Sequence, residues 1–276
     1  MRIRNSLKVV LIAGAATFAL AACGEKTAAP PAPASGEDAG PAPAAAVNYD
    51  EIAAAAVADP ARSDEDRSND ARRKPATALA FMQVKPGLSV FEMEAGGGWY
   101  TELLSHAVGE SGSVVMQNPE GFLAFVGEEI NARLANDRLS NVRQSLSVFD
   151  ALDTADGSID LVTWVQGPHE LYYTPDDGTF LGDPFKSYAE IYRILKPGGA
   201  FVVIDHSAVP GSPETTGNEL HRIDRSIVVD MAEGAGFMLE ADSGFLANPD
   251  DSRTANVFDP SIRGYTDQFA LRFRKP

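Results

Sequence analysis

Residues 88–104 have the sequence LSVFEMEAGGGWYTELL, in which a short apolar run, a glycine-rich turn and the start of a helix follow one another directly. The apolar run has the length and residue types of a buried strand. Gly96, Gly97 and Gly98 allow a sharp turn and a close approach of backbone to a ligand, and the next helix offers free N–H groups at its first turn. This order predicts a parallel sheet with a binding site at the carboxyl ends of its strands.

The rest of the chain alternates short apolar runs with helical periods, which is typical of strands joined by crossover helices. The predicted strands cover residues 88–93, 113–117, 142–147, 159–165 and 200–205. Helices are expected over Pro75–Met82, over the stripe Tyr188, Ile191, Tyr192 and Leu195, and over the stripe Leu220, Ile223, Ile227 and Met231. Near the end, Phe269, Leu271 and Phe273 alternate with polar or small residues, which predicts a closing strand with one buried face. The fold class is therefore α/β.

The N-terminal segment predicts export. Arg2, Arg4 and Lys8 precede an apolar run from Val9 to Ala22 that is short for a membrane span, as in a signal peptide over residues 1–22. The chain has 39 acidic and 23 basic residues, a formal net charge of −16. Such acidity disfavours nucleic acid and anionic lipid surfaces as partners, although it is also typical of plain solubility.

The signal segment ends in Leu20-Ala21-Ala22-Cys23-Gly24, which resembles the bacterial lipobox and implies lipidation at Cys23. Cys23 is the single cysteine, so no disulfide can form within the chain. The Ala- and Pro-rich residues 23–47 indicate an extended tether, and residues 48–276 are expected to form one folded domain. These features predict an exported lipoprotein, held on the periplasmic side by its anchor. Gly24, rather than Asp, follows the cysteine, and by resemblance to the sorting rules of bacterial lipoproteins this favours the outer membrane. The oligomeric state cannot be read from the sequence.

Four landmarks occur in the order and spacing of class I S-adenosylmethionine-dependent methyltransferases. They are the acid-x-Gly-x-Gly-x-Gly turn at 92–98, the end of the second strand at 117–118, Asp160-Leu-Val in the fourth strand, and Leu195-Lys-Pro-Gly-Gly199 before the fifth. The chain resembles this family, and more closely its predicted, poorly characterised exported lipoprotein members in bacteria. The resemblance implies a Rossmann-like, mainly parallel seven-stranded sheet with an antiparallel last strand.

The same resemblance implies that the glycine turn binds S-adenosylmethionine. Glu92 would face its methionyl end, and the backbone at Gly96, Gly97 and Gly98 would pass beneath the cofactor. Glu94 stands where the family has its first glycine, which places a side chain and a negative charge in the turn.

Three further positions are implied for the nucleoside. Gln117 and Asn118 end the second strand, where Asn118 would meet the ribose hydroxyls, and Asp150 would lie near the adenine. Asn118 replaces the family's usual carboxylate, and a carboxamide makes a weaker, uncharged bond to the ribose.

Three histidines follow predicted strands or open a predicted helix. His169 follows the fourth strand, His206 follows the fifth, and His221 opens a helix. Each is a candidate general base for methyl transfer, although capping or loop hydrogen bonding is the commoner role of a single histidine. With Asp205 and Glu170 nearby they permit a metal site, but no two of them share an i, i+4 helical face, so the spacing predicts no metal.

The residues thus suggest two classes of function. The first is a methyltransferase acting on an oxygen, nitrogen or carbon nucleophile of a small molecule, and the second is a non-catalytic ligand-binding module on the same fold. A metal-dependent hydrolase is a distant third. A long polar insertion at 247–266, with Arg253 and Arg263, is either a lid or a solvated loop held by Asp–Arg pairs.

Overall fold

A computed structural model describes residues 46–175, 178 and 180–276, and residues 46–276 form one compact unit. The predicted signal peptide, Cys23 and all but the end of the tether lie outside the described residues. Within the described ranges, no helix combines the length and apolar composition needed to cross a bilayer.

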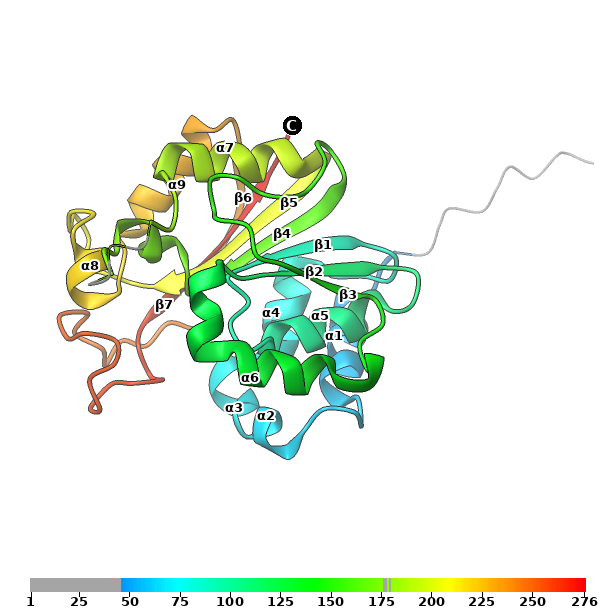
Figure 1. Cartoon of the computed structure of the whole chain (residues 1–276). Helices are drawn as coiled ribbons and strands as arrows, with labels where there is room; N and C mark the ends of the chain where they lie inside the picture. Colours follow the sequence, from blue (N-terminus) through cyan, green and yellow to red (C-terminus); the bar gives the residue numbers. More distant parts are fainter. Residues whose placement is uncertain (1–45, 176–177, 179) are drawn as a thin grey trace, which may run out of the picture. The chain divides into compact units, whose positions relative to one another are not determined.

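The centre of the unit is a seven-stranded sheet in the order β3-β2-β1-β4-β5-β7-β6 (Figure 1). Its strands are β1 (Ser89–Met93), β2 (Ser113–Gln117), β3 (Val142–Ser145), β4 (Ile159–Val165), β5 (Leu195–His206), β6 (Met238–Ser243) and β7 (Gln268–Arg274). Strands β1 to β5 pair in parallel, and β7 pairs antiparallel with both β5 and β6. The expected mainly parallel sheet with an antiparallel last strand is confirmed.

Two layers of helices cover the sheet, with α7 and α9 on the upper face in Figure 1 and α1, α4 and α5 on the lower face. The helices are α1 (Tyr49–Ala58), α2 (Asp64–Ser68), α3 (Asp70–Arg73), α4 (Pro75–Met82), α5 (Trp99–Val108), α6 (Leu123–Leu134), α7 (Pro184–Ile194), α8 (Thr216–Leu220) and α9 (Arg225–Gly234). Short 3-10 turns are η1 (Glu120–Phe122), η2 (Ala135–Asp137) and η3 (Pro168–Tyr172). The segment between Tyr49 and Pro75 is thus largely helical.

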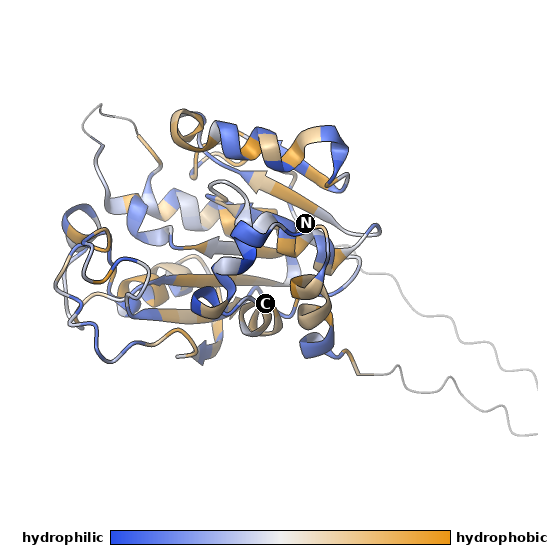
Figure 2. Ribbon diagram, turned by 90° about the horizontal axis from the view of Figure 1, so that it is seen from below, coloured by the Kyte–Doolittle hydropathy of each residue, from blue (hydrophilic) through white to orange (hydrophobic). Residues whose placement is uncertain are grey.

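The strand register aligns large apolar side chains in rows across the sheet. Phe91 pairs with Val162, Val162 with Phe201, and Phe201 with Phe273, and all four side chains are fully buried under α7 and α9. Neighbouring positions such as Val90 and Leu161 point to the other face, where α1, α4 and α5 cover them. Figure 2 shows the result, with apolar residues gathered on the strands and polar residues on the long connections.

Three sequence predictions need correction at their boundaries. Strand β3 ends at Ser145 and not at residue 147, because the Ser145 hydroxyl donates to Asp153 Oδ1 (2.6 Å) and bonds the Ser147 hydroxyl as the chain turns. The Leu195–Gly199 segment, expected to precede the fifth strand, is the irregular start of β5, and Leu195 lies in that strand and not in α7. The closing strand has both faces covered, since Ala270 is as buried as Leu271.

The helix predicted from the stripe 220–231 is also wrong as one helix. Helix α8 ends at Leu220, His221 adopts a left-handed conformation with φ +53°, and Asp224 caps α9 by accepting a hydrogen bond from Ser226 N. His221 therefore closes a helix and does not open one. The cause is long-range: Arg222, fully buried, pairs with Asp251 of the polar insertion.

Candidate functional site

The glycine turn between β1 and α5 is held from behind by the end of β2. Backbone N of Glu94 donates to Gln117 Oε1 (2.8 Å), and Ala95 N donates to the Gln117 carbonyl (2.9 Å). The Asn118 carboxamide brackets Gly96, accepting from its N–H (2.8 Å) and donating to its carbonyl (3.1 Å). The turn thus has a fixed shape. Gln117 and Asn118 support it rather than line the space in front of it.

The glycines of this turn are required by what packs against them. Gly98 has φ +84°, and a Cβ there would lie 2.7 Å from Arg133 Cδ. A Cβ on Gly97 would lie 1.9 Å from Glu129 Oε2 and 3.1 Å from Glu129 Cβ, so the Glu129 side chain of α6 would have to move. Gly96 differs, because no protein atom lies within 4 Å of where its Cβ would be. The open side of the turn is therefore at Gly96.

A cavity of about 750 Å³ lies in front of this turn. It is bounded by the end of β1, the turn, the α2–α3 segment, the first residues of α5, helix α6 and the end of β4. Of the cofactor residues predicted from the sequence, Glu92, Glu94, Gly96 and Gly97 line it. This is the position at the carboxyl ends of parallel strands where ligands bind in open α/β sheets.

A cationic side chain and a buried carboxyl group line this cavity. Glu92 is almost fully buried at the end of β1 and accepts a hydrogen bond from Thr101 Oγ1; its burial raises its pKa to about 8, although Thr101 and Arg73 act in the opposite direction. The Arg73 guanidinium lies 4.0 Å above the Trp99 ring and 4.9 Å above the Tyr100 ring. Among the described residues no carboxylate forms a salt bridge with Arg73. The cavity thus holds an available cation beside a buried carboxyl group.

Arg73 is a site residue that the sequence analysis missed. It lies in the charged cluster before Pro75, where one arginine among many polar residues gives no local signal. Only Trp99, directly after the glycine turn, could have suggested that this cluster lies near the turn. In the structure, Trp99 Nε1 donates a hydrogen bond to the Asp66 carbonyl (3.0 Å). Trp99 itself lines the cavity.

Glu94 lines the cavity from a strained position, with φ +51° in the left-handed region that costs an ordinary residue about 1 kcal/mol. Its Oε2 accepts a hydrogen bond from Trp164 Nε1 (2.9 Å). Burial and the nearby Glu170 charge raise the pKa of Glu94 well above its usual range. Gly167 makes this contact possible, because a Cβ there would lie 2.3 Å from Glu94 Oε2. Burial and the Glu170 charge therefore both favour the protonated form of Glu94.

Helix α6 is fixed over the turn by an ion-pair network centred on the buried Glu102. Arg133 Nε donates to the Gly97 carbonyl (2.6 Å), and its guanidinium pairs with Asp66 (2.9 Å) and with Glu102. Arg138 also pairs with Glu102. Burial alone would raise the pKa of Glu102, but these partners lower it to about 2. The network joins the α2–α3 segment, α5 and α6 around the cavity.

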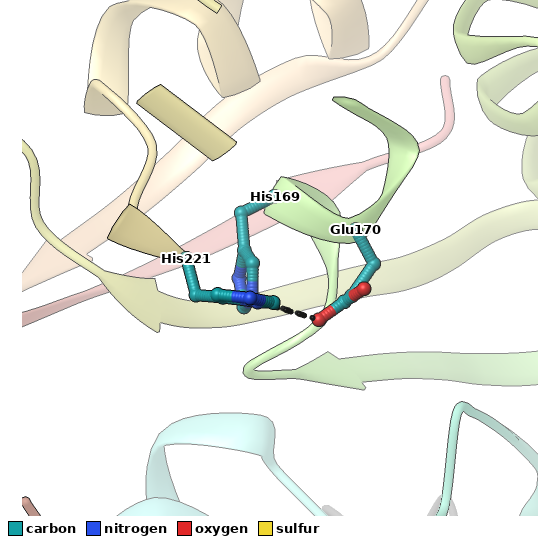
Figure 3. Close-up of side chains that lie close together, drawn as sticks. All are labelled: His169, Glu170 and His221. Carbon is teal, nitrogen blue, oxygen red and sulfur yellow. Dashed lines mark hydrogen bonds and ion pairs between the residues drawn. The ribbon is translucent and has the colours of Figure 1, made fainter. Parts of the chain in front are cut away.

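A second group of polar side chains lies beyond the ends of β4 and β5 (Figure 3). Glu170 Oε1 is 3.2 Å from His169 Nε2 and 3.1 Å from His221 Nδ1. His169 Nδ1 is 2.8 Å from Oδ1 of the fully buried Asp205. Burial would lower the pKa of His169, but Asp205 and Glu170 raise it to about 10.

The three candidate general bases do not line the cavity in front of the glycine turn. His169 and His221 meet at Glu170, while His206 bonds Thr266 Oγ1 through Nδ1 (2.7 Å). Burial lowers the pKa of His206 to about 3, so its imidazole is neutral. The structure therefore brings the three histidines together, with the His169 ring 5.9 Å from that of His206 and 5.5 Å from that of His221, and none of them lines the cavity.

Asp150, predicted beside the adenine, also lies away from the cavity lining. Its Oδ2 accepts a hydrogen bond from Asp183 N (3.1 Å), at the start of α7. The 247–266 insertion packs against α8, where Val257 N donates to the Leu220 carbonyl (3.1 Å). Arg253 pairs with Asp267 (3.0 Å), as the interpretation of a loop held by Asp–Arg pairs expects.

Comparison with known proteins assigns this arrangement to a family. The model of the ubiE/COQ5 methyltransferase family matches residues 71–217, which include the glycine turn, α6 and the start of β5. A ubiquinone/menaquinone biosynthesis C-methyltransferase UbiE from Hydrogenovibrio crunogenus is 32% identical over 133 residues, 48% of this chain and 47% of the relative. The corresponding Stenotrophomonas maltophilia K279a protein is 32% identical over 137 residues, again 48% and 47%. The chain therefore spans about half the length of these curated relatives.

Solved structures agree on the fold. A SAM-dependent methyltransferase from Aquifex aeolicus superposes with a TM-score of 0.53 at 19% identity, covering 84% of this chain and all of the other. A geranyl diphosphate C-methyltransferase from Streptomyces coelicolor, determined with S-adenosyl-L-homocysteine, gives 0.53 at 14% identity over 80% of this chain and 84% of the other. At these identities the likeness establishes the architecture alone.

Proposed function

This chain belongs to the ubiE/COQ5 methyltransferase family, and from this membership we propose that it transfers a methyl group from S-adenosylmethionine to a small molecule. The observation that supports the proposal is the presence of both Arg73 and Glu92 in the lining of the cavity in front of the glycine turn. A zwitterionic amino acid end, which S-adenosylmethionine has, needs one cation and one anion at its binding site.

The cavity fits this cofactor in charge and in shape. Arg73 would bind the α-carboxylate. Glu92 would bind the α-ammonium group, whose positive charge would favour release of the proton that burial keeps on Glu92 at neutral pH. The space at Gly96 lets a ligand lie against the backbone, since no protein atom is near its Cβ position. Support from Gln117 and Asn118 keeps the turn in this shape without a ligand's help.

When bound, the cofactor supplies an electrophilic methyl group on a sulfonium centre. The chain's residues bind, orient and enclose it, and orientation of this kind can contribute several kcal/mol to lowering a barrier. Glu94 lines the cavity, and burial favours its protonated form, which would donate a hydrogen bond to a polar atom of the acceptor. Trp164 keeps the other side of its carboxyl group in place.

The chemical class of the methyl acceptor is a separate and more specific part of the proposal. The relatives' names describe C-methyltransferases of ubiquinone and menaquinone biosynthesis, so a carbon nucleophile is the first acceptor class to test. Oxygen and nitrogen nucleophiles are the next acceptor classes to test.

Calorimetric titration of the full chain with S-adenosylmethionine and its demethylated product tests the proposal. Arg73→Ala should weaken binding at least about tenfold, the effect of losing one charge-assisted pair of about 1.5 kcal/mol. Arg72→Ala is the matched control, because Arg72 is exposed, bonds Asn69 Oδ1 (2.5 Å) and does not line this cavity.

The outcomes separate the two classes of function. Absence of heat and of any thermal shift at millimolar ligand would refute cofactor binding. Binding that is lost in Arg73→Ala, without methyl transfer to any acceptor offered, would favour the non-catalytic ligand-binding module. Equal affinity of the Arg73 and Arg72 variants would refute the assigned pose.

We also propose that the protein is an exported lipoprotein anchored through Cys23, on the periplasmic side of the outer membrane. The lipobox-like sequence before Gly24 supports this. Metabolic labelling with an alkyne fatty acid should mark the wild type and not Cys23→Ser, and membrane fractionation should place the labelled protein in the outer membrane. A labelled Cys23→Ser variant would refute the anchor, and recovery in the inner membrane would refute the assigned membrane.

A further inference from the structure

Three side chains from two distant segments converge beyond the ends of β4 and β5 (Figure 3). His169 and Glu170 come from η3, and His221 follows α8. One ligand atom from each lies within 4.8 Å of the other two. All three side chains are largely but not completely buried, with 4 to 13% of each exposed. The group is therefore shielded from bulk water but still reachable from it.

The distances within the group fit a shared metal ion. Two ligands bound to zinc at about 2.0–2.1 Å with a tetrahedral angle are about 3.3 Å apart. His169 Nε2 and His221 Nδ1 lie 3.2 and 3.1 Å from the same oxygen, Glu170 Oε1. The hydrogen bond between His169 Nδ1 and Asp205 is shorter, at 2.8 Å, as expected for a charge-assisted bond.

The other nitrogen of His169 is already oriented. Asp205 Oδ1 bonds Nδ1 of His169 and accepts from His206 N (2.7 Å), and Oδ2 accepts from the His169 backbone N (3.0 Å). A carboxylate on the far nitrogen fixes the tautomer that leaves Nε2 free for a metal, which is the usual arrangement behind metal-bound histidines.

The backbone around His221 is held in place at some energetic cost. Its φ of +53° is unusual for a residue with a side chain, and it persists because Arg222 is anchored by a buried pair with Asp251 (2.8 Å). Gly217 lets α8 approach η3, since a Cβ there would lie 2.6 Å from the His169 carbonyl. These features bring His221 to Glu170 before any ion binds.

We infer that His169 Nε2, Glu170 and His221 Nδ1 bind a divalent transition metal ion of the zinc class. Imidazole and carboxylate together favour zinc or ferrous iron over magnesium. Three protein ligands leave a coordination position for water or for an oxygen of a small molecule. The inference goes beyond the proposed methyl transfer and does not depend on it, because the ligand atoms belong to a different group of residues from the glycine turn.

Metal binding by the full chain tests the inference directly. The protein would carry Cys23→Ser and a tag free of histidine, because thiolates and histidine tags bind zinc. After chelation and dialysis, Zn²⁺ and Co²⁺ are titrated against a chromophoric competitor, with Mg²⁺ as the hard-cation comparison. We expect one equivalent of Zn²⁺, and a Co²⁺ absorption spectrum typical of nitrogen and oxygen ligands.

Ligand variants locate the site. His221→Ala and Glu170→Gln should each weaken Zn²⁺ binding about 100-fold or more, and Asp205→Asn, behind His169, about 10- to 100-fold. His106→Ala is the control, since this histidine of α5 also has carboxylate neighbours, Asp59 and Glu102. Circular dichroism checks that each variant folds, and Glu170→Gln is nearly isosteric. Less than one equivalent of bound zinc in the parent protein, or unchanged affinity in both folded ligand variants, would overturn the inference.

Discussion

The buried carboxyl group of Glu92 makes a prediction about stability as a function of pH. Its pKa is raised from 4.5 to about 8 because folding removes it from water. The folded state thus holds a proton that the unfolded chain loses near its ordinary pKa. Wild-type stability should therefore fall as pH rises from 4.5 to 8, and Glu92→Gln should remove this dependence.

The magnitude follows from linkage. One pKa unit corresponds to about 1.4 kcal/mol. The raised pKa of Glu92 therefore lowers the free energy of unfolding at pH 7 by about 3 kcal/mol, relative to its value below pH 4.5. From pH 5 to pH 8 the free energy of unfolding of Glu92→Gln should rise by about 3 to 4 kcal/mol relative to wild type. The change with pH is the measured quantity, because the altered packing of the amide acts equally at every pH. The amide that Glu92→Gln introduces keeps a carbonyl that can accept the Thr101 hydrogen bond.

Urea denaturation followed by tryptophan fluorescence at pH 5, 6, 7 and 8 measures this change. The matched control is Glu102→Gln. The pKa of Glu102 is lowered to about 2, so its stabilising effect is present above pH 4.5 and lost only as pH falls toward 2. Glu102→Gln should thus be destabilised by a constant amount between pH 5 and 8. A Glu92→Gln difference that is equally flat over this range would refute the burial argument.

Three other substitutions test contacts in the fold. Asp251→Ala should lower the free energy of unfolding by about 3 to 5 kcal/mol, because it leaves Arg222 buried and unpaired; replacing both residues with apolar ones should restore part of the loss in urea melts. Gly217→Ala should destabilise by about 1 to 3 kcal/mol in thermal melts through its clash with the His169 carbonyl, and a neutral result would contradict the close packing of α8 on η3. Asp183→Ala removes the cap of α7 and should cost about 1 kcal/mol, whereas Asp183→Asn should retain most of it.

The sheet could be predicted because its signals are local. Each strand is a short apolar run, and the turn at Gly96–Gly98 marks the change from strand to helix within a few residues. The resemblance to the family added the seven-stranded, mainly parallel sheet and its antiparallel last strand. Helix α4 likewise begins at Pro75, as a proline in the first turn indicates.

The errors arose where distant residues decide the local conformation. The periodicity of residues 220–231 fits one helix, yet the pairing of Arg222 with Asp251 interrupts it. Such a pair spans 29 residues and leaves no trace in the local pattern. The same reason explains why Arg73 was missed in a charged segment whose position relative to the glycine turn only the tertiary structure gives.

The candidate sites show the same difference between local signals, which the sequence reveals, and contacts between distant residues, which it does not. The sequence identified His169, Glu170 and His221 individually, and their spacing predicted no metal. Their convergence depends on how η3 and α8 meet beyond the sheet, which no helical period encodes. Asn118 and Asp150 stay predictions as cofactor residues, and the structure shows their side chains engaged with the backbone of Gly96 and Asp183.

The position of β7 between β5 and β6 has a consequence for the order in which the protein can fold. Strand β6 is made before β7 during synthesis, but among the strands of the described residues it pairs with β7 alone. Until β7 arrives, β6 has no strand to pair with and β5 presents an open edge, so the emerging chain cannot complete its core. Late closure of this kind delays stable folding. It would favour an unfolded chain until β7 is available, which suits the export proposed above.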